Sequence, residues 1–498
     1  MRPDFHRSSP LACHTRWALQ AVVLASLTAC ANYAGIHPQA QMMGNEALPA
    51  NAAAVPAIDT QWWRAFGDAQ LNHLVDQALA ANPSLRVAQA RLARVQAASD
   101  AVAGADLPQV VASTDLSRQR FSANSIYPPP LGGAILNTGD LRASASWELD
   151  FFGKNSAALE ASLGQVRAAQ ADAAAARMLL ASSVARSYLS LLRIQAQLDV
   201  AERTLAQRTQ TRALVQDRVN AGLDTQLELK HSDSALPDAR LQIESLKEQQ
   251  ALAKNALAAL TAQPIGSLAL VDTAQAAIKP IAVANSIPLD LLGRRPDIAA
   301  ARARVEAASA DVASAKAQFY PNINLVGFAG FSSIGFDKLT QSGSDQWSVG
   351  PAIRLPLFEG GRLRANLRGK TAELDGAVES YNGLILDAVR DVADQLASAQ
   401  SITRQQTEQA AAQSSAEAAY AIATQRYQAG LGNYLQVLSA ETAVLAQRRL
   451  AVDLAGRALD TQVQLIRALG GGYSDAVSTA PVATARATSS NPSSAPTP

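Results

Sequence analysis

The 498-residue sequence has few of the residues that usually carry catalytic or metal-binding chemistry. It contains two cysteines and five scattered histidines. Two cysteines cannot build a disulfide framework or a cysteine-based zinc site. A His-Glu-x-x-His motif, a Walker loop and a Gly-x-Gly-x-x-Gly turn are also missing. We therefore expect no enzymatic activity, no cofactor and no metal site.

Charge is scarce as well. Charged residues make up 17% of the chain, and the formal net charge is +1. No Lys/Arg-rich block stands out, so we expect no binding of nucleic acid. The hydrophobic share of 48% is nevertheless enough for a buried core, which excludes general disorder.

The apolar run at the N-terminus is too short to span a membrane. Residues 17–27, WALQAVVLASL, form a run of about 11 residues, whereas a spanning helix needs roughly 20. Arginines precede this run and small residues follow it. This layout predicts a secretory signal peptide over residues 1–29.

The end of this segment, Leu27-Thr28-Ala29-Cys30, resembles a bacterial lipobox. The resemblance implies cleavage between Ala29 and Cys30 and attachment of acyl chains such as palmitate to Cys30. The alternative is an ordinary signal peptide followed by a chance cysteine. Ala31 stands where an aspartate commonly retains lipoproteins at the inner membrane, which favours the outer membrane. Residues 30–60 are then a lipid-anchored N-terminal extension.

Proline is absent from residues 151–236 and again from residues 357–480. The stretch from Ser156 to Asn220 alone would reach about 97 Å as one continuous helix. Globular helices average about 11–12 residues. Such uninterrupted length, rich in small side chains, predicts a coiled coil or a helical tube.

Two short stretches repeat each other at a fixed distance. Arg218 and Gly222 recur 208 residues later as Arg426 and Gly430. Each glycine follows a long helical pattern, where a helix commonly ends with a left-handed residue. The next helical pattern starts at once, so we predict helical hairpin tips near residues 222 and 430.

A second duplication pairs residues 82–110 with residues 295–323. The repeat of about 210 residues is too long for a solenoid unit and indicates duplication of a whole half. The predicted organisation is a first repeat at 61–262, a linker at 263–294, a second repeat at 295–470 and a disordered tail at 471–498.

Each half also contains segments of alternating polar and apolar residues, which predict β-strands. We place them at about 109–120, 140–152, 321–332 and 346–356. A half-buried soluble sheet alternates in the same way, but segments of 9–11 residues also suit a transmembrane barrel. Four strands cannot close a barrel around a pore, so the chain would share a barrel with further copies.

Several longer motifs together resemble the outer membrane factor family, of the TolC/OprM/NodT type. They are WWRAFGDAQLNHLVDQALAANPSL at 62–85, LLGRRPDIAAARARVEAASADVASAKAQFYPNINL at 291–325, LPLFEGGR at 355–362 and RYQAGLGNYLQVLSAETAV at 426–444. The implied fold is a mixed α+β membrane protein. Long helices form a coiled-coil α-barrel, and four strands per chain contribute to a shared 12-stranded trimeric β-barrel.

The resemblance also implies a function and partners. The homotrimer would be the outer-membrane exit duct of a tripartite efflux pump, a passive conduit that extends into the periplasm. It would work with a periplasmic adaptor, or membrane fusion protein, and an inner-membrane pump of the RND type, and it would contact outer-membrane lipid.

The tips would form the periplasmic gate of such a duct. Family members often carry an aspartate in the tip helix, but the matching positions here are Gln436 and Ser439. The first-half equivalents are Glu228 and His231. Three copies of Glu228 would form an acidic ring if they faced the axis; the alternative is a solvated position on the helix surface.

Arg218 and Arg426 either pair with neighbouring helices or the adaptor, or lie on a solvated face. Two other functions remain open from the residues: a duct for type I protein secretion, and a non-conducting, lipid-tethered periplasmic coiled-coil protein.

Overall fold

The computed structural model describes residues 33–44, 58–124, 126–268, 275, 278–281 and 291–474. The predicted signal peptide, its cleavage site and the lipidation site at Cys30 lie outside these residues, as do most of the predicted linker and tail. Within the described part of the chain, no helix is long and apolar enough to cross a membrane.

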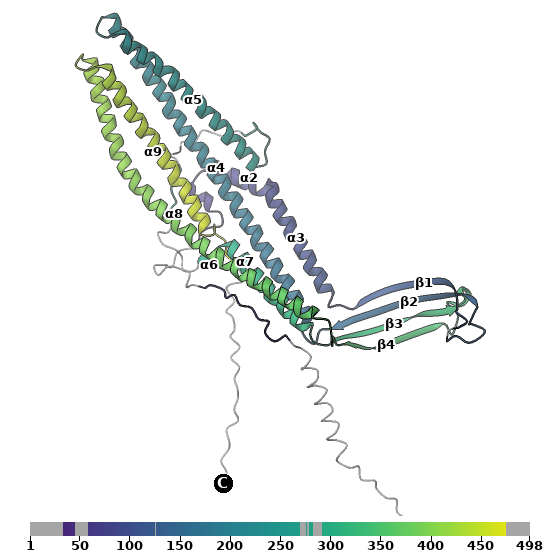
Figure 1. The fold of residues 1–498 in the computed structure, drawn as a ribbon. Coiled ribbons are helices and arrows are strands. Elements are labelled where there is room, and N and C mark those ends of the chain that lie inside the picture. Colours follow the sequence, from purple (N-terminus) through teal and green to yellow (C-terminus); the bar gives the residue numbers. More distant parts are fainter. Residues whose placement is uncertain are drawn as a thin grey trace, which may run out of the picture. The chain divides into compact units, whose positions relative to one another are not determined.

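The described chain is mostly helical, with four strands in one sheet (Figure 1). In chain order the elements are η2 (Trp62–Phe66), α2 (Ala69–Ala81), α3 (Pro83–Gly104), β1 (Gln109–Arg120), β2 (Ile135–Leu149), α4 (Lys154–Asn220), α5 (Gln226–Leu260), α6 (Leu291–Arg294), α7 (Pro296–Ala317), β3 (Asn322–Ile334), η4 (Phe336–Lys338), β4 (Asp345–Arg354), α8 (Arg362–Gln428) and α9 (Tyr434–Ala468).

The lengths of the helices reflect the duplication in the sequence. The helices α4 and α8 each have 67 residues, and α5 and α9 each have 35. The helix expected from Ser156 to Asn220 begins two residues earlier, at Lys154. In each half the long helix turns back into the shorter one, so that α4–α5 and α8–α9 form two hairpins (Figure 1).

The contacts divide the chain into two compact units, and each unit takes segments from both halves of the sequence. The first unit comprises Met1–Gly44, Pro83–Ala176 and Ala300–Asp387. The second comprises Asn45–Asn82, Arg177–Ala299 and Ala388–Pro498. Each unit is therefore built from both duplicated halves, and the long helices α4 and α8 run through both units.

The sheet in the first unit is an antiparallel meander in the order β1-β2-β3-β4. Its strands agree with the predicted segments to within about five residues, and the largest difference is the earlier start of β2, at Ile135. Residues 135–139 read ILNTG, which lacks a clear alternation, so the pattern alone did not reveal this start.

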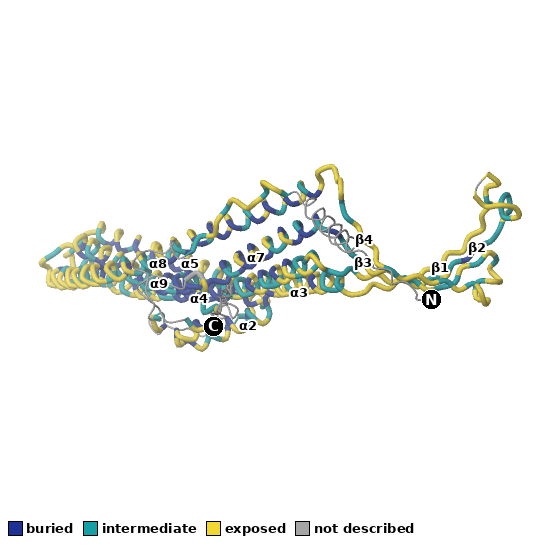
Figure 2. Tube along the Cα trace, turned by 90° about the horizontal axis from the view of Figure 1, so that it is seen from below, coloured by how far each residue is buried: buried dark blue, intermediate teal, exposed yellow. Residues whose placement is uncertain are grey.

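The register of the sheet gathers polar and apolar side chains on opposite faces. Asp115 pairs with Asp140, and Ser113 pairs with Arg142, on one face. The other face carries large apolar side chains that are exposed in the single chain: Leu141, Trp147, Leu325, Trp347, Val349 and Ile353. Figure 2 shows exposed residues along much of the sheet. One apolar and one polar face is the pattern of a lipid-facing sheet.

Small side chains let the helices of the first unit approach closely. Gly164 of α4 lies against Ala307 of α7, and a Cβ added to Gly164 would lie 2.8 Å from the Ala307 Cβ. The hydroxyls of Ser99 and Ser162 are 2.9 Å apart and link α3 to α4. Figure 2 shows buried positions repeating along α7. The alanine-rich composition thus gives close helix contacts, as the sequence suggested.

The second unit has an aromatic core beside the helices. Trp62, Trp63 and Phe66 of η2 are buried, and the Tyr188 hydroxyl of α4 donates to Asp68 Oδ2 at 2.8 Å. The other carboxylate oxygen of Asp68 accepts from the backbone at the start of α2. One carboxylate therefore caps a helix and fixes it to α4.

We expect Gly164→Ala to lower the free energy of unfolding by about 1–3 kcal/mol, because the new methyl group overlaps Ala307. Gly369→Ala is the control. Gly369 also lies inside a long helix, but its added Cβ meets nothing within 4 Å, so stability should stay equal or rise by up to about 1 kcal/mol. Thermal unfolding in detergent measures both. Equal midpoints for the two variants would contradict the close α4–α7 packing.

Candidate functional site at the two hairpin tips

The two repeated stretches form matching turns in the second unit. Gly222 and Gly430 have φ values of 71° and 75°, a left-handed conformation that suits glycine. In each tip the amide after the glycine donates to the carbonyl of the preceding arginine at 2.8 Å, from Leu223 to Arg218 and from Leu431 to Arg426. These bonds satisfy the last carbonyls of α4 and α8, so each glycine ends its helix.

The returning helices begin with different caps. Thr225 and Glu228 form a capping box at the start of α5, in which the Glu228 side chain accepts from the Thr225 amide at 3.0 Å. The hydrogen bond from the Thr225 hydroxyl also lowers the pKa of Glu228. At the start of α9, Asn433 accepts from the Gln436 amide at 3.1 Å. Glu228 therefore stabilises its own helix.

Arg218, Asp224 and Tyr427 join the two tips, and we name them the tip lock. The Arg218 Nε donates to Asp224 Oδ2 at 2.9 Å, and the Tyr427 hydroxyl donates to the same oxygen. The Arg218 guanidinium also lies 4.5 Å from the centre of the Tyr427 ring. Because Tyr427 belongs to α8 and the other two residues to the first tip, one carboxylate links both hairpins.

The tip lock is largely shielded from water. The side chains of Arg218 and Asp224 are 12% and 10% exposed, and Tyr427 is fully buried. Burial and the bond to Asp224 raise the pKa of Tyr427, so its phenol remains a proton donor. The hydrogen bond to Asp224 raises the pKa of Arg218. A shielded ion pair with an added phenol contributes more to stability than an ion pair on the surface.

An apolar cluster shares Tyr427 with the tip lock and contains residues of α4, α5, α8 and α9. Its buried members are Val215, Leu229, Tyr427, Tyr434 and Val437. The rings of Tyr427 and Tyr434 are 6.0 Å apart. Burial, followed by the charge of Glu441, raises the pKa of Tyr434 to about 12. Polar and apolar contacts therefore hold the same pair of hairpins together.

A second polar cluster lies further along the hairpins. Glu441 of α9 accepts from Arg208 Nε and from Gln207 Nε2 of α4, both at 3.3 Å. Gln207 also donates to the Tyr420 hydroxyl of α8 at 2.7 Å. The Glu441 side chain is 6% exposed. Burial raises the pKa of Glu441, and Arg208 partly opposes that rise.

The residues singled out in the sequence have unequal environments. Arg218 pairs with Asp224 in the turn of its own tip and lies over the Tyr427 ring of α8. Arg426 is exposed, and its guanidinium donates to the Leu431 carbonyl at 3.4 Å. The three remaining positions, His231, Gln436 and Ser439, are also exposed in the single chain. The structure therefore does not bring these three together with the tip lock.

Asp224 and Tyr427 were missed by the sequence reasoning, although the duplication contains a signal. The residue that matches Asp224 in the second tip is Gly432, and the residue that matches Tyr427 in the first is Val219. The two halves thus differ at two of the three positions that build the tip lock. A search for polar residues where the repeats diverge would have found both.

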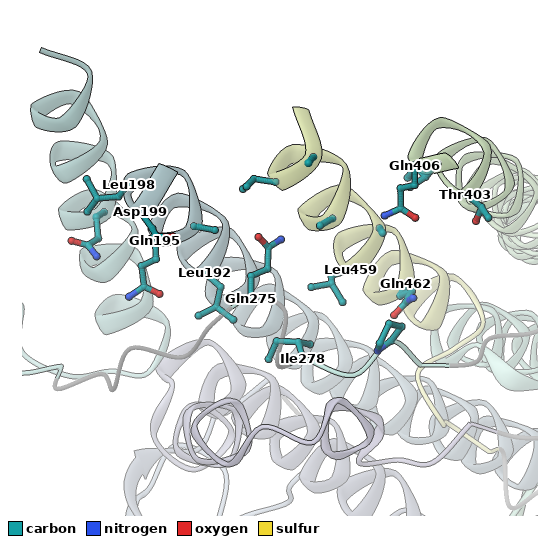
Figure 3. A pocket seen from close by; sticks show the side chains of 18 of the residues that line it. Leu192, Gln195, Leu198, Asp199, Gln275, Ile278, Thr403, Gln406, Leu459 and Gln462 are labelled. Atoms are coloured by element: carbon teal, nitrogen blue, oxygen red, sulfur yellow. The ribbon is translucent and has the colours of Figure 1, made fainter. Parts of the chain in front are cut away.

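A cleft of about 1080 Å³ lies elsewhere in the second unit, between α4, α5, α8 and α9 (Figure 3). Leucine and glutamine side chains line much of it, including Leu192, Gln195, Leu459 and Gln462. The Gln462 side chain accepts from the Ile281 amide at 3.0 Å, which ties the segment around residues 278–281 to α9. None of the tip-lock residues lines this cleft.

Comparison with known proteins identifies the family. The model of the outer membrane efflux protein family matches residues 74–263 and 287–471. Fusaric acid resistance protein FusA of Burkholderia cepacia is 36% identical over 375 residues, which cover 72% of this chain and 70% of that protein. Multidrug resistance outer membrane protein MdtQ of Escherichia coli O157:H7 is 33% identical over 432 residues, covering 83% and 88%.

A solved structure agrees with this assignment. The crystal structure of the outer membrane protein VceC of Vibrio cholerae matches with a TM-score of 0.78 at 35% identity, covering 83% of this chain and 99% of that one. The chain belongs to the outer membrane efflux protein family. It is an outer-membrane channel protein that serves as an efflux exit duct, with long helices and strands that contribute to a shared β-barrel.

We expect Asp224→Ala to loosen the tips, because Arg218 and Tyr427 both lose their acceptor. Each hydrogen bond to a charged group contributes about 1.5–3 kcal/mol, so amide hydrogen exchange across residues 221–225 should rise roughly 10- to 100-fold. Arg426→Ala is the matched control, since the equivalent arginine of the second tip is exposed and donates to a carbonyl. Unchanged exchange in Asp224→Ala would contradict the tip lock.

The raised pKa of Glu441 predicts a pH dependence of defined sign. Between the ordinary glutamate value of 4.5 and the higher folded value, the folded chain binds more protons than the unfolded one. The contribution of Glu441 to stability therefore grows as the pH falls through this window. Thermal unfolding at pH 7 and pH 5 tests this. The unfolding midpoint of wild type, relative to that of Glu441→Gln, should be higher at pH 5 than at pH 7. A constant difference would refute the assignment.

Proposed function

We propose that three copies of this chain form the exit duct of a tripartite pump that moves small molecules from the periplasm to the exterior. The duct is passive, and its partners are a periplasmic adaptor and an inner-membrane pump of the RND type. The observation that carries the proposal is the four-stranded sheet, whose apolar face is exposed and whose outer strands are β1 and β4.

The number of copies follows from the requirement that the outer strands of the sheet find pairing partners. Outer strands present unpaired backbone groups, which are costly in lipid unless another strand pairs with them. Two copies would give eight strands and a lumen mostly filled with side chains, whereas three give twelve strands and room for a channel. Pairing β4 of one copy with β1 of the next closes the barrel and turns the polar face inward.

The tip lock is proposed to hold the periplasmic mouth closed. It joins the first hairpin to the second within one chain, so the hairpins cannot separate while the Asp224 bonds persist. Opening exchanges these bonds for contacts with water or with the adaptor. Because a bound adaptor can replace them, it shifts the balance toward the open state.

The class of cargo is inferred from the relatives. FusA is named for resistance to fusaric acid, and MdtQ is named for multidrug resistance. We accordingly propose small organic molecules as the cargo, selected by the pump upstream. Catalysis is not part of the proposal. Lipidation at Cys30 remains a prediction that accompanies the proposed outer-membrane anchor.

The assembly is tested with purified protein in mild detergent. We expect unboiled wild type to migrate as a trimer and to conduct ions in planar bilayers, and Asp224→Ala to conduct several-fold more because its tips open more often. Arg426→Ala should conduct like wild type. A soluble, non-conducting particle after removal of the lipid would instead favour a tethered periplasmic protein.

A further inference from the structure

The described N-terminal segment, residues 33–44, lies along α8 in the first unit, and we name it the strap. The amides of Gln39 and Ala40 donate to Asp375 Oδ1 at 2.9 and 3.0 Å. The Asn382 side chain accepts from the Met43 amide at 2.8 Å and donates to the Gln41 carbonyl at 2.9 Å. Because side chains of α8 bind its backbone, the strap has a fixed register.

The first residue of the strap lies among aromatic side chains. The Tyr33 ring packs edge-on to Phe319, with centres 5.7 Å apart, and its hydroxyl is 3.5 Å from that of Tyr320. The Tyr320 ring in turn stacks on Phe152, at 5.1 Å and an angle of 9°. The strap therefore starts where α7 ends and β3 begins, at the junction between helices and sheet.

Tyr320 and Phe152 also line a cavity of about 500 Å³ at this junction. The two related motifs LDFFGK, residues 149–154, and LPLFEGGR, residues 355–362, form most of its wall. Three apolar side chains of this wall are strongly exposed in the single chain: Phe151 at 67%, Leu357 at 78% and Phe358 at 91%. Such exposure of large apolar groups indicates a surface that another apolar group covers.

Four of the six charged side chains in this wall form two ion pairs. Lys154 lies 2.5 Å from Glu148, and Arg362 lies 2.5 Å from Glu359. The other two are Asp150, which accepts from the Ser156 amide at 2.8 Å, and Arg354, which is exposed at the end of β4. Because most of these charges already have partners, the apolar side chains form the part of the cavity that suits a hydrocarbon chain.

We propose that this cavity binds an acyl chain attached to Cys30. Cys30 precedes Tyr33 by three residues, and three residues reach at most about 11 Å. The strap holds Tyr33 against the cavity wall, so an acyl chain on Cys30 starts within reach of it. Attachment to the same chain also keeps this acyl chain near the cavity.

The inference depends on the predicted lipidation of Cys30 and not on conduction by the duct. It adds that the lipid is not only an anchor in the bilayer. One of its chains fills a cavity between the sheet and the helices and covers Phe151 and Phe358. The acyl group thus becomes part of the packing at the base of the strands.

Photocrosslinking tests the proposal on the full chain in its native membrane. Cells are supplied with a fatty acid that carries a diazirine along its chain, the membranes are irradiated, and crosslinked peptides are identified by mass spectrometry. We expect the N-terminal lipopeptide to be linked to peptides that contain residues 149–154 or 355–362. Cys30→Ser behind an ordinary cleavable signal is the control, and it should lose these links.

Several outcomes would overturn the proposal. In the first, the label on Cys30 is linked only to phospholipid. In the second, it is linked only to the outer face of the strands around Trp347. In the third, the links join two copies of the chain, and in the fourth, Cys30 carries no label. The fourth outcome would also contradict the predicted lipidation of Cys30. The proposed duct would not be affected, because conduction in planar bilayers is measured separately.

Matched variants sharpen the test. Phe358→Ser should reduce links from the lipopeptide to residues 149–154 by about threefold or more, because the hydrocarbon surface that retains the chain is diminished. Val349→Ser is the control, since Val349 is 66% exposed on the apolar face of β4 but does not line the cavity. Equal losses in both variants would show that the acyl chain lies in the bilayer instead.

Discussion

Backbone pairing at the outer strands of the sheet is the constraint on which the proposed assembly depends. A four-stranded sheet with one apolar face has no stable place in lipid until β1 and β4 find partners. Further copies of the chain supply these partners in the proposed trimer. The closed ring then positions the long helices of every copy around one axis. The membrane part thus imposes the symmetry that the helical part needs to form a tube.

The tips show how a duplicated chain acquires a contact between its two halves. The two hairpins share the same turn, and both end their long helix at a left-handed glycine. This contact forms where the halves diverge, at Asp224 in one tip and Tyr427 in the other. A carboxylate in one half and a phenol in the other can bond only across the hairpins. The same divergence explains why Arg218 is shielded while Arg426 remains exposed.

Much of the fold could be predicted from regular patterns in the sequence. Proline-free stretches indicated the long helices, and alternation of residue type indicated the four strands. The tip lock could not be predicted in this way, because its partners Asp224 and Tyr427 are 203 residues apart and one sequence does not show which residues meet. Glu441 was missed for the same reason, since its partners Arg208 and Gln207 lie on another helix, α4. Periodicity reports local structure, whereas these contacts depend on how the hairpins pack.

The central claim is that three chains share one barrel that continues into a helical tube. An image of the intact particle by electron cryo-microscopy, at a resolution that separates strands, tests it most directly. The account predicts threefold symmetry, twelve strands in the membrane and a single lumen along the axis. A particle in which one chain closes its own barrel, or in which no lumen runs through, would contradict it.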